Sequence, residues 1–340
     1  MIASGAEDRA GSARRPDSDI VVEWSWLDGW WAVVLPMWPA GLAIGLDGTV
    51  LLSDARSKTL WRISGQEAQT KPQRARAEAV VLAGRPMLSP KGIAVDDRGT
   101  VFVADSSGHR VWTITPQGSL ELLAGGISGC EDGQGRGARF RFPTGVAIGP
   151  DRTCYVADTG NDRIRLVRPD GRVETVAGSI YDWGDGEGAL ARFRRPESLI
   201  VDAEGVCYVA DTGNNAIRRL DPDGGVTTIA GSPLGGEADG LGSEAGFRWP
   251  MGITIGDNAH LWVADHGNGS IRQVESTGRC TTALRCSGRR RPVAVARAPG
   301  GSVIAAIAVL DRVRGPETFL VHLQRREVAE AEEEHGIPGR

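Results

Sequence analysis

One phrase recurs along the chain at nearly constant intervals. VADTGNDRIRLV occupies residues 156–167, VADTGNNAIRRL occupies residues 209–220, and weaker copies occupy residues 103–114 and 263–274. Repetition with a period of about 20–50 residues indicates stacked structural units, because each unit buries its apolar face only against its neighbours. The phrase therefore describes an architecture before it describes an active site.

Six prolines open the units, and the interior of each unit has a fixed length. In five units an aspartate follows the proline by fifteen residues, whereas the sixth unit has Ile307 at that position. Successive prolines are 51, 53, 53, 54 and 42 residues apart, so the length varies only between the units. The prolines are Pro39, Pro90, Pro143, Pro196, Pro250 and Pro292, and the aspartates are Asp54, Asp105, Asp158, Asp211 and Asp265.

Each unit contains four short segments with the pattern of β-strands. In the second unit these are residues 92–96, 100–105, 110–114 and 120–125, and turns rich in Gly, Asp and Pro separate them. Four-stranded antiparallel blades around an axis form a β-propeller, so the sequence predicts an all-β, six-bladed propeller. The last unit lacks a fourth strand, and we expect the N-terminal segment VVEWSWLDG, residues 21–29, to pair into the last blade and close the ring.

The flanks and the composition bound the domain and its compartment. We expect a disordered tail over residues 1–19, one propeller over residues 20–325, and an acidic tail over residues 326–340. The N-terminal tail lacks the apolar core of a signal peptide, and no apolar run reaches the length of a membrane span. The five cysteines include no CxxC pair and suit buried free thiols, which favours a reducing, cytoplasmic compartment. We also expect the chain to be a monomer.

The unit resembles a known repeat. Its pattern PxGIAVDxxGxVYVADxxNxxIRxxxxxGxVxTxAG is similar to the NHL repeat, over about residues 39–286. The connectors at residues 132–140, 185–193 and 239–247 also resemble the DGxGxxAxF segment between NHL repeats. The resemblance implies a β-propeller from a family that includes interaction scaffolds, RNA-binding domains of ubiquitin ligases, and relatives of metal-dependent lyases and lactonases.

The repeated aspartates suit a structural role in turns. We expect Asp211 to accept hydrogen bonds from backbone N–H groups of its own turn, in which Gly213 and Asn214 are residues that tolerate positive φ. Ile217 then returns to the core, while Arg218 points to the other face of the blade. A ring of such carboxylates suggests a metal site, but each aspartate lies in a separate blade, which favours the structural interpretation.

Binding is expected on the face that carries the long connectors, because long loops on a rigid scaffold commonly bind ligands. The phenylalanines Phe140, Phe193 and Phe247 end the connectors and are expected to pack beneath them. Arginines and acids alternate within the same loops, which predicts salt-bridged mixed charge. The predicted binding residues are Tyr181, Asp182, Trp183, Asp185, Arg139, Arg192 and Arg194.

The sequence favours a non-enzymatic scaffold that binds a protein or peptide. The alternative is a hydrolase or lyase that depends on Ca²⁺ or Zn²⁺ in the central channel, although the five histidines show no ligand spacing and GxSxG and Walker motifs are absent. No cofactor is predicted for the scaffold. RNA binding is the third possibility, and the net charge of −4 with interspersed acids argues against a nucleic-acid partner.

Overall fold

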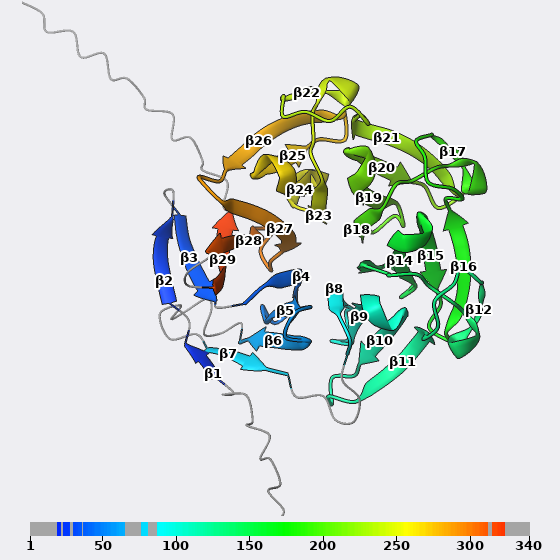
Figure 1. The fold of residues 1–340 in the computed structure, drawn as a ribbon, viewed down its shortest axis with the longest axis horizontal. Helices are drawn as coiled ribbons and strands as arrows, with labels where there is room; N and C mark the ends of the chain where they lie inside the picture. The colour runs from blue at the N-terminus through cyan, green and yellow to red at the C-terminus, as the bar shows by residue number, and fades with distance from the viewer. Residues whose placement is uncertain are drawn as a thin grey trace, which may run out of the picture.

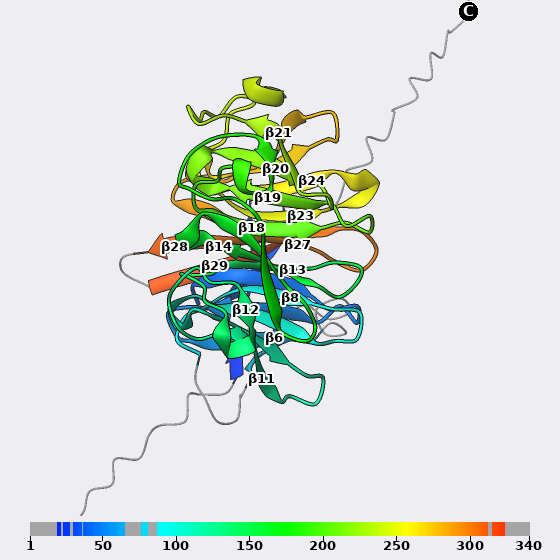
Figure 2. The ribbon, with the colours of Figure 1, turned by 90° about the vertical axis from the view of Figure 1, so that its right-hand side faces the viewer.

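The computed structural model describes residues 19–21, 23–27, 30–35, 37–64, 76–80, 87–311 and 315–323. Within these ranges the chain forms antiparallel sheets and short 3-10 helices. Six sheets surround a common axis, as Figure 1 shows face-on and Figure 2 shows edge-on. The predicted all-β, six-bladed propeller is confirmed.

Blade 2 has the four predicted strands, and blade 1 has four with an unpredicted fifth strand, β1, outside them; in both blades the first strand of the unit lies nearest the axis. Their sheets have the orders β1-β7-β6-β5-β4 and β11-β10-β9-β8. Blade 1 contains β4 (Pro39–Ile44), β5 (Val50–Asp54), β6 (Thr59–Ile63), β7 (Arg76–Ala79) and β1 (Asp19–Val21). Blade 2 contains β8 (Pro90–Val95), β9 (Val101–Asp105), β10 (Arg110–Ile114) and β11 (Leu120–Gly125).

Blades 3, 4 and 5 each have a fifth strand that the sequence did not predict. Two residues of the preceding connector pair with the outer strand of the blade, because the connector crosses that edge. Blade 3 contains β13 (Gly145–Ile148), β14 (Cys154–Asp158), β15 (Arg163–Val167), β16 (Arg172–Ala177) and β12 (Gly133–Gln134). Blade 4 contains β18 (Pro196–Val201), β19 (Cys207–Asp211), β20 (Ala216–Leu220), β21 (Gly225–Gly231) and β17 (Gly186–Glu187). Blade 5 contains β23 (Pro250–Ile255), β24 (Leu261–Asp265), β25 (Ser270–Val274), β26 (Arg279–Arg285) and β22 (Gly240–Leu241).

Blade 6 joins the two ends of the described chain. It contains β27 (Arg290–Arg297), β28 (Val303–Asp311) and β29 (Gly315–Leu323), followed by β3 (Trp30–Leu35) and β2 (Glu23–Leu27). The strand beside β29 is β3, with Leu35 opposite Thr318, and Figure 1 shows these blue and red strands side by side. The segment predicted for this position, residues 21–29, instead supplies the outermost strand β2. The apolar sequence WWAVVL of β3 suits an inner strand better than the segment that contains Glu23.

Short 3-10 helices mark the ends of strands and connectors. Four follow the second strands of blades 2 to 5, three lie in the connectors before blades 3 to 5, and one joins the first two strands of blade 5. They are η2 (Ser106–Gly108), η3 (Gly135–Gly137), η4 (Thr159–Asn161), η5 (Gly188–Leu190), η6 (Thr212–Asn214), η7 (Gly242–Glu244), η8 (Asp257–Ala259) and η9 (His266–Asn268).

The core lies between neighbouring blades. One cluster combines Ala157 and Ile164 of blade 3 with Leu199 and Val209 of blade 4, and all four are buried. Each blade therefore depends on both neighbours for burial, which gives a rigid ring. Of the two tails predicted from the sequence, residues 1–18 and 324–340 lie outside the described residues, and Asp19 begins β1.

The two faces of the ring differ in their loops. The antiparallel register brings the start of each first strand beside the end of the second strand, as Pro196 opposite Asp211 shows. The blade-to-blade connectors end at these same prolines. We call this side the connector face. The turns within residues 96–99, 149–152 and 202–205 lie on the opposite face.

Candidate functional site

A buried arginine ties the connector before blade 4 to that blade. Arg218 on β20 is fully buried, and its Nη1 donates to Asp211 Oδ2 at 2.8 Å. Its Nη2 donates to Asp185 Oδ1 at 2.8 Å. The same nitrogens also donate to the carbonyl oxygens of Arg192 and Gly184, at 3.0 and 2.7 Å. We call this arrangement an arginine clamp, because one guanidinium group fixes both ends of a loop against the end of β19.

Blades 3 and 5 contain the same arginine clamp. Arg165 contacts Asp158 at 2.8 Å and Asp132 at 2.7 Å. Arg272 contacts Asp265 at 3.2 Å and Asp239 at 2.9 Å. In each clamp the guanidinium carbon lies 5.2 Å from the centroid of a phenylalanine ring. These rings belong to Phe140, Phe193 and Phe247, which are fully buried beneath the connectors as predicted.

In the clamps of blades 3 and 5, the pKa of the inner carboxylate is raised and the pKa of the outer carboxylate is lowered. Burial raises the pKa of Asp211 to about 6, although Arg218 and a backbone N–H favour the charged form. Burial also raises the pKa of Asp158 and of Asp265. Partial burial acts in the same direction on Asp132, but hydrogen bonds from Thr175 and Arg165 outweigh it and lower the pKa. The inner carboxylate therefore carries the desolvation cost of the clamp.

The repeated aspartates are structural, but only Asp54 forms the turn that the sequence predicts. Its Oδ1 accepts hydrogen bonds from the backbone N–H groups of Arg56 and Ser57, two and three residues later. Asp211 Oδ1 instead accepts the N–H of Arg194, seventeen residues earlier, at 2.8 Å. The prediction was wrong for this blade because η6 lies against the connector. The backbone N–H of Arg194 in that connector donates to Asp211 in place of the N–H groups of the turn. Asp105, Asp158 and Asp265 likewise bind N–H groups of preceding connectors.

In the repeated TGN turn, positive φ occurs one residue beyond the two residues that the sequence indicated. Positive φ occurs at Asn215, at +51°, and not at Gly213 or Asn214. Gly213 is required for another reason, since a Cβ atom there would lie 2.6 Å from the carbonyl oxygen of Arg194. Asn214 donates its side-chain amide to Asp211 Oδ2 and to the carbonyl of Asp182, at 2.8 and 2.9 Å. The turn is therefore shaped by close contact with the connector.

The predicted binding residues divide into three groups. Asp185 belongs to the clamp of blade 4, and the half-buried Trp183 lies with its ring centroid 4.8 Å from the guanidinium of Arg218. Arg192 pairs with Asp182, and Arg139 pairs with Glu131. Only Tyr181 and Arg194 remain at an open site: the Arg194 Nε donates to the Tyr181 hydroxyl, and its guanidinium lies 4.5 Å above the ring.

A polar pocket of about 540 Å³ opens on the connector face across blades 2, 3 and 4. Tyr181 lines it, and Phe142 stands exposed beside it. Its charged residues are Lys91, Arg141, Arg195, Asp162 and Glu197, and its hydroxyl residues are Ser89, Ser106, Ser107, Thr144 and Thr159. We call this cavity the rim pocket, because Lys91, Thr144 and Glu197 also line the mouth of the central channel.

The residue before the opening proline is displayed in the same way in three blades. Phe142, Arg195 and Trp249 have φ of +48°, +50° and +51°, which is an uncommon conformation for non-glycine residues. A side chain from the preceding blade accepts each of their backbone N–H groups. The acceptors are His109 Nδ1, Asp162 Oδ1 and Asn215 Oδ1, at 3.1, 2.7 and 2.9 Å. These contacts hold three exposed side chains on the connector face, each two residues before a residue that lines the channel mouth.

Burial favours the protonation state of His109 that this contact requires. Its ring accepts the Phe142 N–H and meets the Phe142 ring edge-on, with centroids 4.7 Å apart. Burial lowers the pKa of His109, which favours the neutral ring with a free lone pair on Nδ1.

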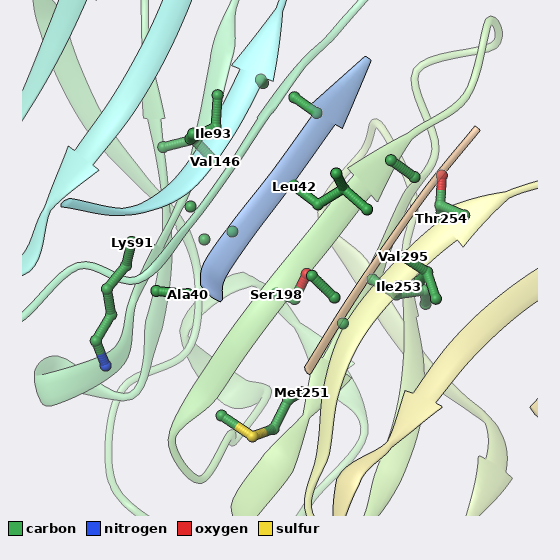
Figure 3. Close-up of a pocket in the computed structure, with 18 of the residues that line it drawn as sticks. Ala40, Leu42, Lys91, Ile93, Val146, Ser198, Met251, Ile253, Thr254 and Val295 are labelled. Atoms are coloured by element: carbon green, nitrogen blue, oxygen red, sulfur yellow. The ribbon is translucent and has the colours of Figure 1, made fainter. Parts of the chain in front are cut away.

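The central channel contains a cavity of about 440 Å³ with mainly apolar walls (Figure 3). Leu42, Ile93, Val146, Ile253 and Val295 line it. Figure 3 places Lys91, Met251 and Ala40 toward one end, where the first strands begin, and Thr254 toward the other. The channel thus shares Lys91, Thr144 and Glu197 with the rim pocket at the connector face, and aliphatic side chains line it further in.

The described residues do not assemble a metal-binding group. No three His, Cys, Asp or Glu side chains within the described ranges lie close enough together to hold a metal ion. His260 contacts Gln273, and His266 contacts the carbonyl of Pro292. In the same ranges, no helix is long and apolar enough to cross a bilayer.

Sequence reasoning missed Lys91, Phe142 and Arg195 as residues of the rim pocket, and Trp249 as the equivalent exposed residue before blade 5. Arg195 and its neighbours had been assigned to mixed surface charge, which is correct for Arg139 and Arg192. The guanidinium of Arg141 forms no ion pair with any described residue. These residues could have been found from the differences among the repeats. The positions on either side of the opening proline vary among the blades, while much of the surrounding repeat recurs.

The NHL repeat family model matches residues 87–114, which run from the end of the connector through β10. Among curated proteins, the chain is 28% identical over 190 residues to Protein SUPPRESSOR OF QUENCHING 1, chloroplastic, of Arabidopsis thaliana, covering 52% of this chain and 18% of that protein. It is 27% identical over 240 residues to human NHL repeat-containing protein 2, covering 59% of this chain and 33% of that protein. The chain therefore spans well under half the length of these relatives.

Solved structures share the fold at low identity. An auxiliary nutrient binding protein from Bacteroides thetaiotaomicron has a TM-score of 0.62 and 12% identity, covering 89% of this chain and 73% of that one. A gluconolactonase from Xanthomonas campestris has a TM-score of 0.58 and 14% identity, covering 85% and 90%. Virginiamycin B lyase from Staphylococcus aureus has a TM-score of 0.53 and 16% identity, covering 88% and 87%. The repeats, the connectors and the six-bladed ring agree with the match to the NHL repeat model, so the chain contains NHL-type repeats within a β-propeller fold.

Proposed function

We propose that the chain is a non-enzymatic binding domain that holds a protein or peptide partner on its connector face. The observation that carries the proposal is the rim pocket, an open polar cavity of about 540 Å³ flanked by exposed aromatic side chains. Binding sites commonly combine such a cavity with loops held by a rigid scaffold.

Backbone strain supports a functional role for the rim. Phe142 and Trp249 have exposed fractions of 48% and 59%, although burial would be favourable for both side chains. Each is held at positive φ, which costs roughly 1–3 kcal/mol for a non-glycine residue. Strained and exposed aromatic residues on a rigid ring are well suited to contact a partner, because little conformational entropy remains to be lost.

The other functions have less support. The metal-dependent hydrolase or lyase stays a prediction without a ligand set among the described residues. The lyase and lactonase neighbours share only the fold, and fold alone does not imply activity. Absence of a cofactor is part of our proposal, and elemental analysis of the purified protein for calcium and zinc tests it directly. The expected monomer and its cytoplasmic location remain predictions from the sequence.

The proposal is tested by selecting octapeptides from a phage-displayed library on the purified full chain. We expect enriched peptides whose affinity falls at least roughly tenfold in Phe142→Ala, as for loss of an aromatic anchor. Leu46→Ala is the control, because Leu46 is exposed in a turn on the opposite face. The proposal fails if no peptide is enriched, or if the enriched peptides lose affinity in Leu46→Ala and not in Phe142→Ala.

A further inference from the structure

We infer that the rim pocket selects an acidic peptide segment of the partner, with a side-chain carboxylate held by Lys91, Arg141 and Arg195. The inference rests on the proposed function and adds the chemistry of the ligand. It is carried by an excess of cationic groups that the fold leaves at one place on the connector face.

The cationic groups of the rim pocket outnumber its acids. Lys91, Arg141 and Arg195 line the cavity, and Arg194 lies at its edge against Tyr181. Both acids of the cavity already have partners. Asp162 accepts the backbone N–H of Arg195, and the largely buried Glu197 carboxylate lies 3.3 Å from the guanidinium of the same residue. A carboxylate brought by a ligand would therefore meet Lys91 and Arg141 without competition from an unpaired acid.

The connector acids that pair with arginines lie outside the lining of the rim pocket. Asp132, Asp185 and Asp239 are bound by the buried arginines of the clamps. Asp182 pairs with Arg192, away from the cavity lining. The mixed charge of the connectors is thus balanced at the outer part of the face, and the unbalanced positive charge remains at the rim.

The channel mouth has a polar half and an apolar half. Each blade places the residue after its opening proline at the mouth. In blades 2, 3 and 4 these residues are Lys91, Thr144 and Glu197, beside the rim pocket, whereas blades 5, 6 and 1 contribute Met251, Val293 and Ala40. A peptide can satisfy both halves, because it carries a charged side chain, apolar side chains and backbone donors and acceptors on one chain.

A nucleic acid fits this surface less well. A phosphate backbone needs several cations in line, and here Asp162 and Glu197 interrupt the positive groups. The outer arginines Arg139 and Arg192 are already paired with acids. A peptide backbone, in contrast, can donate its N–H groups to these carboxylates and to the hydroxyl groups of the cavity.

The acidic residues 326–340 of the same chain are a less suitable occupant. β29 starts on the connector face, where it continues from the end of β28, and runs to Leu323 on the opposite face. A segment that follows Leu323 begins on the wrong side of the ring. We therefore assign the pocket to another protein.

The test uses the octapeptide library on the full chain, followed by titration of the most enriched peptide, labelled with fluorescein, by fluorescence anisotropy. The same peptide with every Asp and Glu replaced by Asn and Gln is the matched ligand. We expect enrichment of acidic residues, and affinity lower by roughly tenfold or more in Arg141→Gln/Arg195→Gln, the scale of a lost charge-assisted contact. The amide peptide should bind weakly to both proteins.

Arg98→Gln is the control variant, since Arg98 is exposed in a turn on the opposite face. The melting temperature of each variant is measured, and Lys91→Met serves as a second variant if the double variant is not folded. Enriched peptides that lack acids but depend on Phe142 would overturn the acidic ligand and leave the proposed function standing. Absence of any enriched peptide would overturn both.

Two further results would also overturn the inference. One is tighter binding of an octauridylate than of the acidic peptide, with competition between them, because it would assign the pocket to nucleic acid. The other is an affinity more than tenfold higher in a chain that ends at residue 325, because it would show that the acidic tail occupies the pocket.

Discussion

Blades 3 to 5 contain the arginine clamp, whereas blades 1 and 2 use tryptophan at the same position. Seven residues after the repeated aspartate stand Arg165, Arg218 and Arg272 in the first group, and Trp61 and Trp112 in the second. The DGxG connector also occurs only before blades 3, 4 and 5. The buried arginine and the connector that pairs with it are therefore present or absent together.

This difference shows what the arginine clamp contributes. A propeller blade can bury an apolar side chain at this position, and exchange of a buried ion pair for apolar residues can even be stabilising. The clamp is thus unnecessary for a blade but fixes the connector above it. In blades 3 and 4 the fixed connectors end at Phe142 and Arg195, which border the rim pocket.

The largest effect is expected from Arg218→Met. The substitution leaves the buried Asp211 without its cation, and loss of one partner of a buried pair costs about 3–5 kcal/mol in the free energy of unfolding. Arg219→Met is the control, because Arg219 lies next on the same strand with a half-exposed side chain and a surface partner, Asp221. Urea denaturation measures both. Equal effects of the two variants would contradict the clamp.

The next effect is a pH dependence that comes from Asp211. Its pKa in the folded state is about 6, above the ordinary value, so its protonation favours folding. This stabilisation is complete below pH about 4 and is lost as the pH rises through about 6; one pKa unit corresponds to about 1.4 kcal/mol. Asp211→Asn should therefore show a smaller rise in unfolding free energy between pH 7 and pH 5 than the unchanged protein. Parallel curves would show that Asp211 does not titrate in this range.

A smaller effect is expected at the outer end of the clamp. Thr228 Oγ1 donates to Asp185 Oδ1 at 2.8 Å, so Thr228→Val should lower the free energy of unfolding by about 1 kcal/mol. The neighbouring Thr227 is exposed on the same strand, and Thr227→Val should change stability by less than about 0.5 kcal/mol. Thermal unfolding of the two variants at pH 7 separates these outcomes, and the reverse ranking would contradict the assignment.

The smallest effects distinguish the two tryptophan blades. Trp112 Nε1 donates to Asp105 at 3.3 Å, whereas Trp61 Nε1 is buried without a partner among the described residues. Trp112→Phe should cost about 1 kcal/mol, and Trp61→Phe should be neutral or slightly stabilising, because it removes an unsatisfied donor. A loss of stability in Trp61→Phe larger than in Trp112→Phe, measured in the same urea series, would show that Trp61 has a partner.

The sequence predicted the features that each repeat encodes locally. It failed where a residue contacts a segment that is distant in the chain. Strand order, six blades and the buried Phe193 follow from alternation, turn residues and spacing. The partners of Asp211 did not follow, because the N–H of Arg194 lies seventeen residues earlier and only the closed blade brings it near. The identity of the strand beside β29 was missed for the same reason: residues 32–35 and 318–321 pair across almost the whole chain.

The rim pocket was harder to predict than the fold. Tyr181 and Arg194 were selected as unusual residues in a connector, but Trp183 and Asp185 from the same connector turned out to pack on Arg218. The DGxG aspartates and the arginines of the repeat are both visible in the sequence, but only the fold shows that they pair with one another in the clamps. The variable positions beside the opening prolines, such as Lys91 and Phe142, would have been a better guide.

The central claim is that the repeated residues stabilise the ring while the variable rim residues bind the partner. The most direct measurement determines melting temperature and peptide affinity for the same two variants, Thr228→Val and Arg141→Gln/Arg195→Gln. We predict that the first has a lower melting temperature and unchanged affinity, and that the second has an unchanged melting temperature and lower affinity. Loss of affinity in Thr228→Val, or a lower melting temperature with full affinity in the rim variant, would contradict this division.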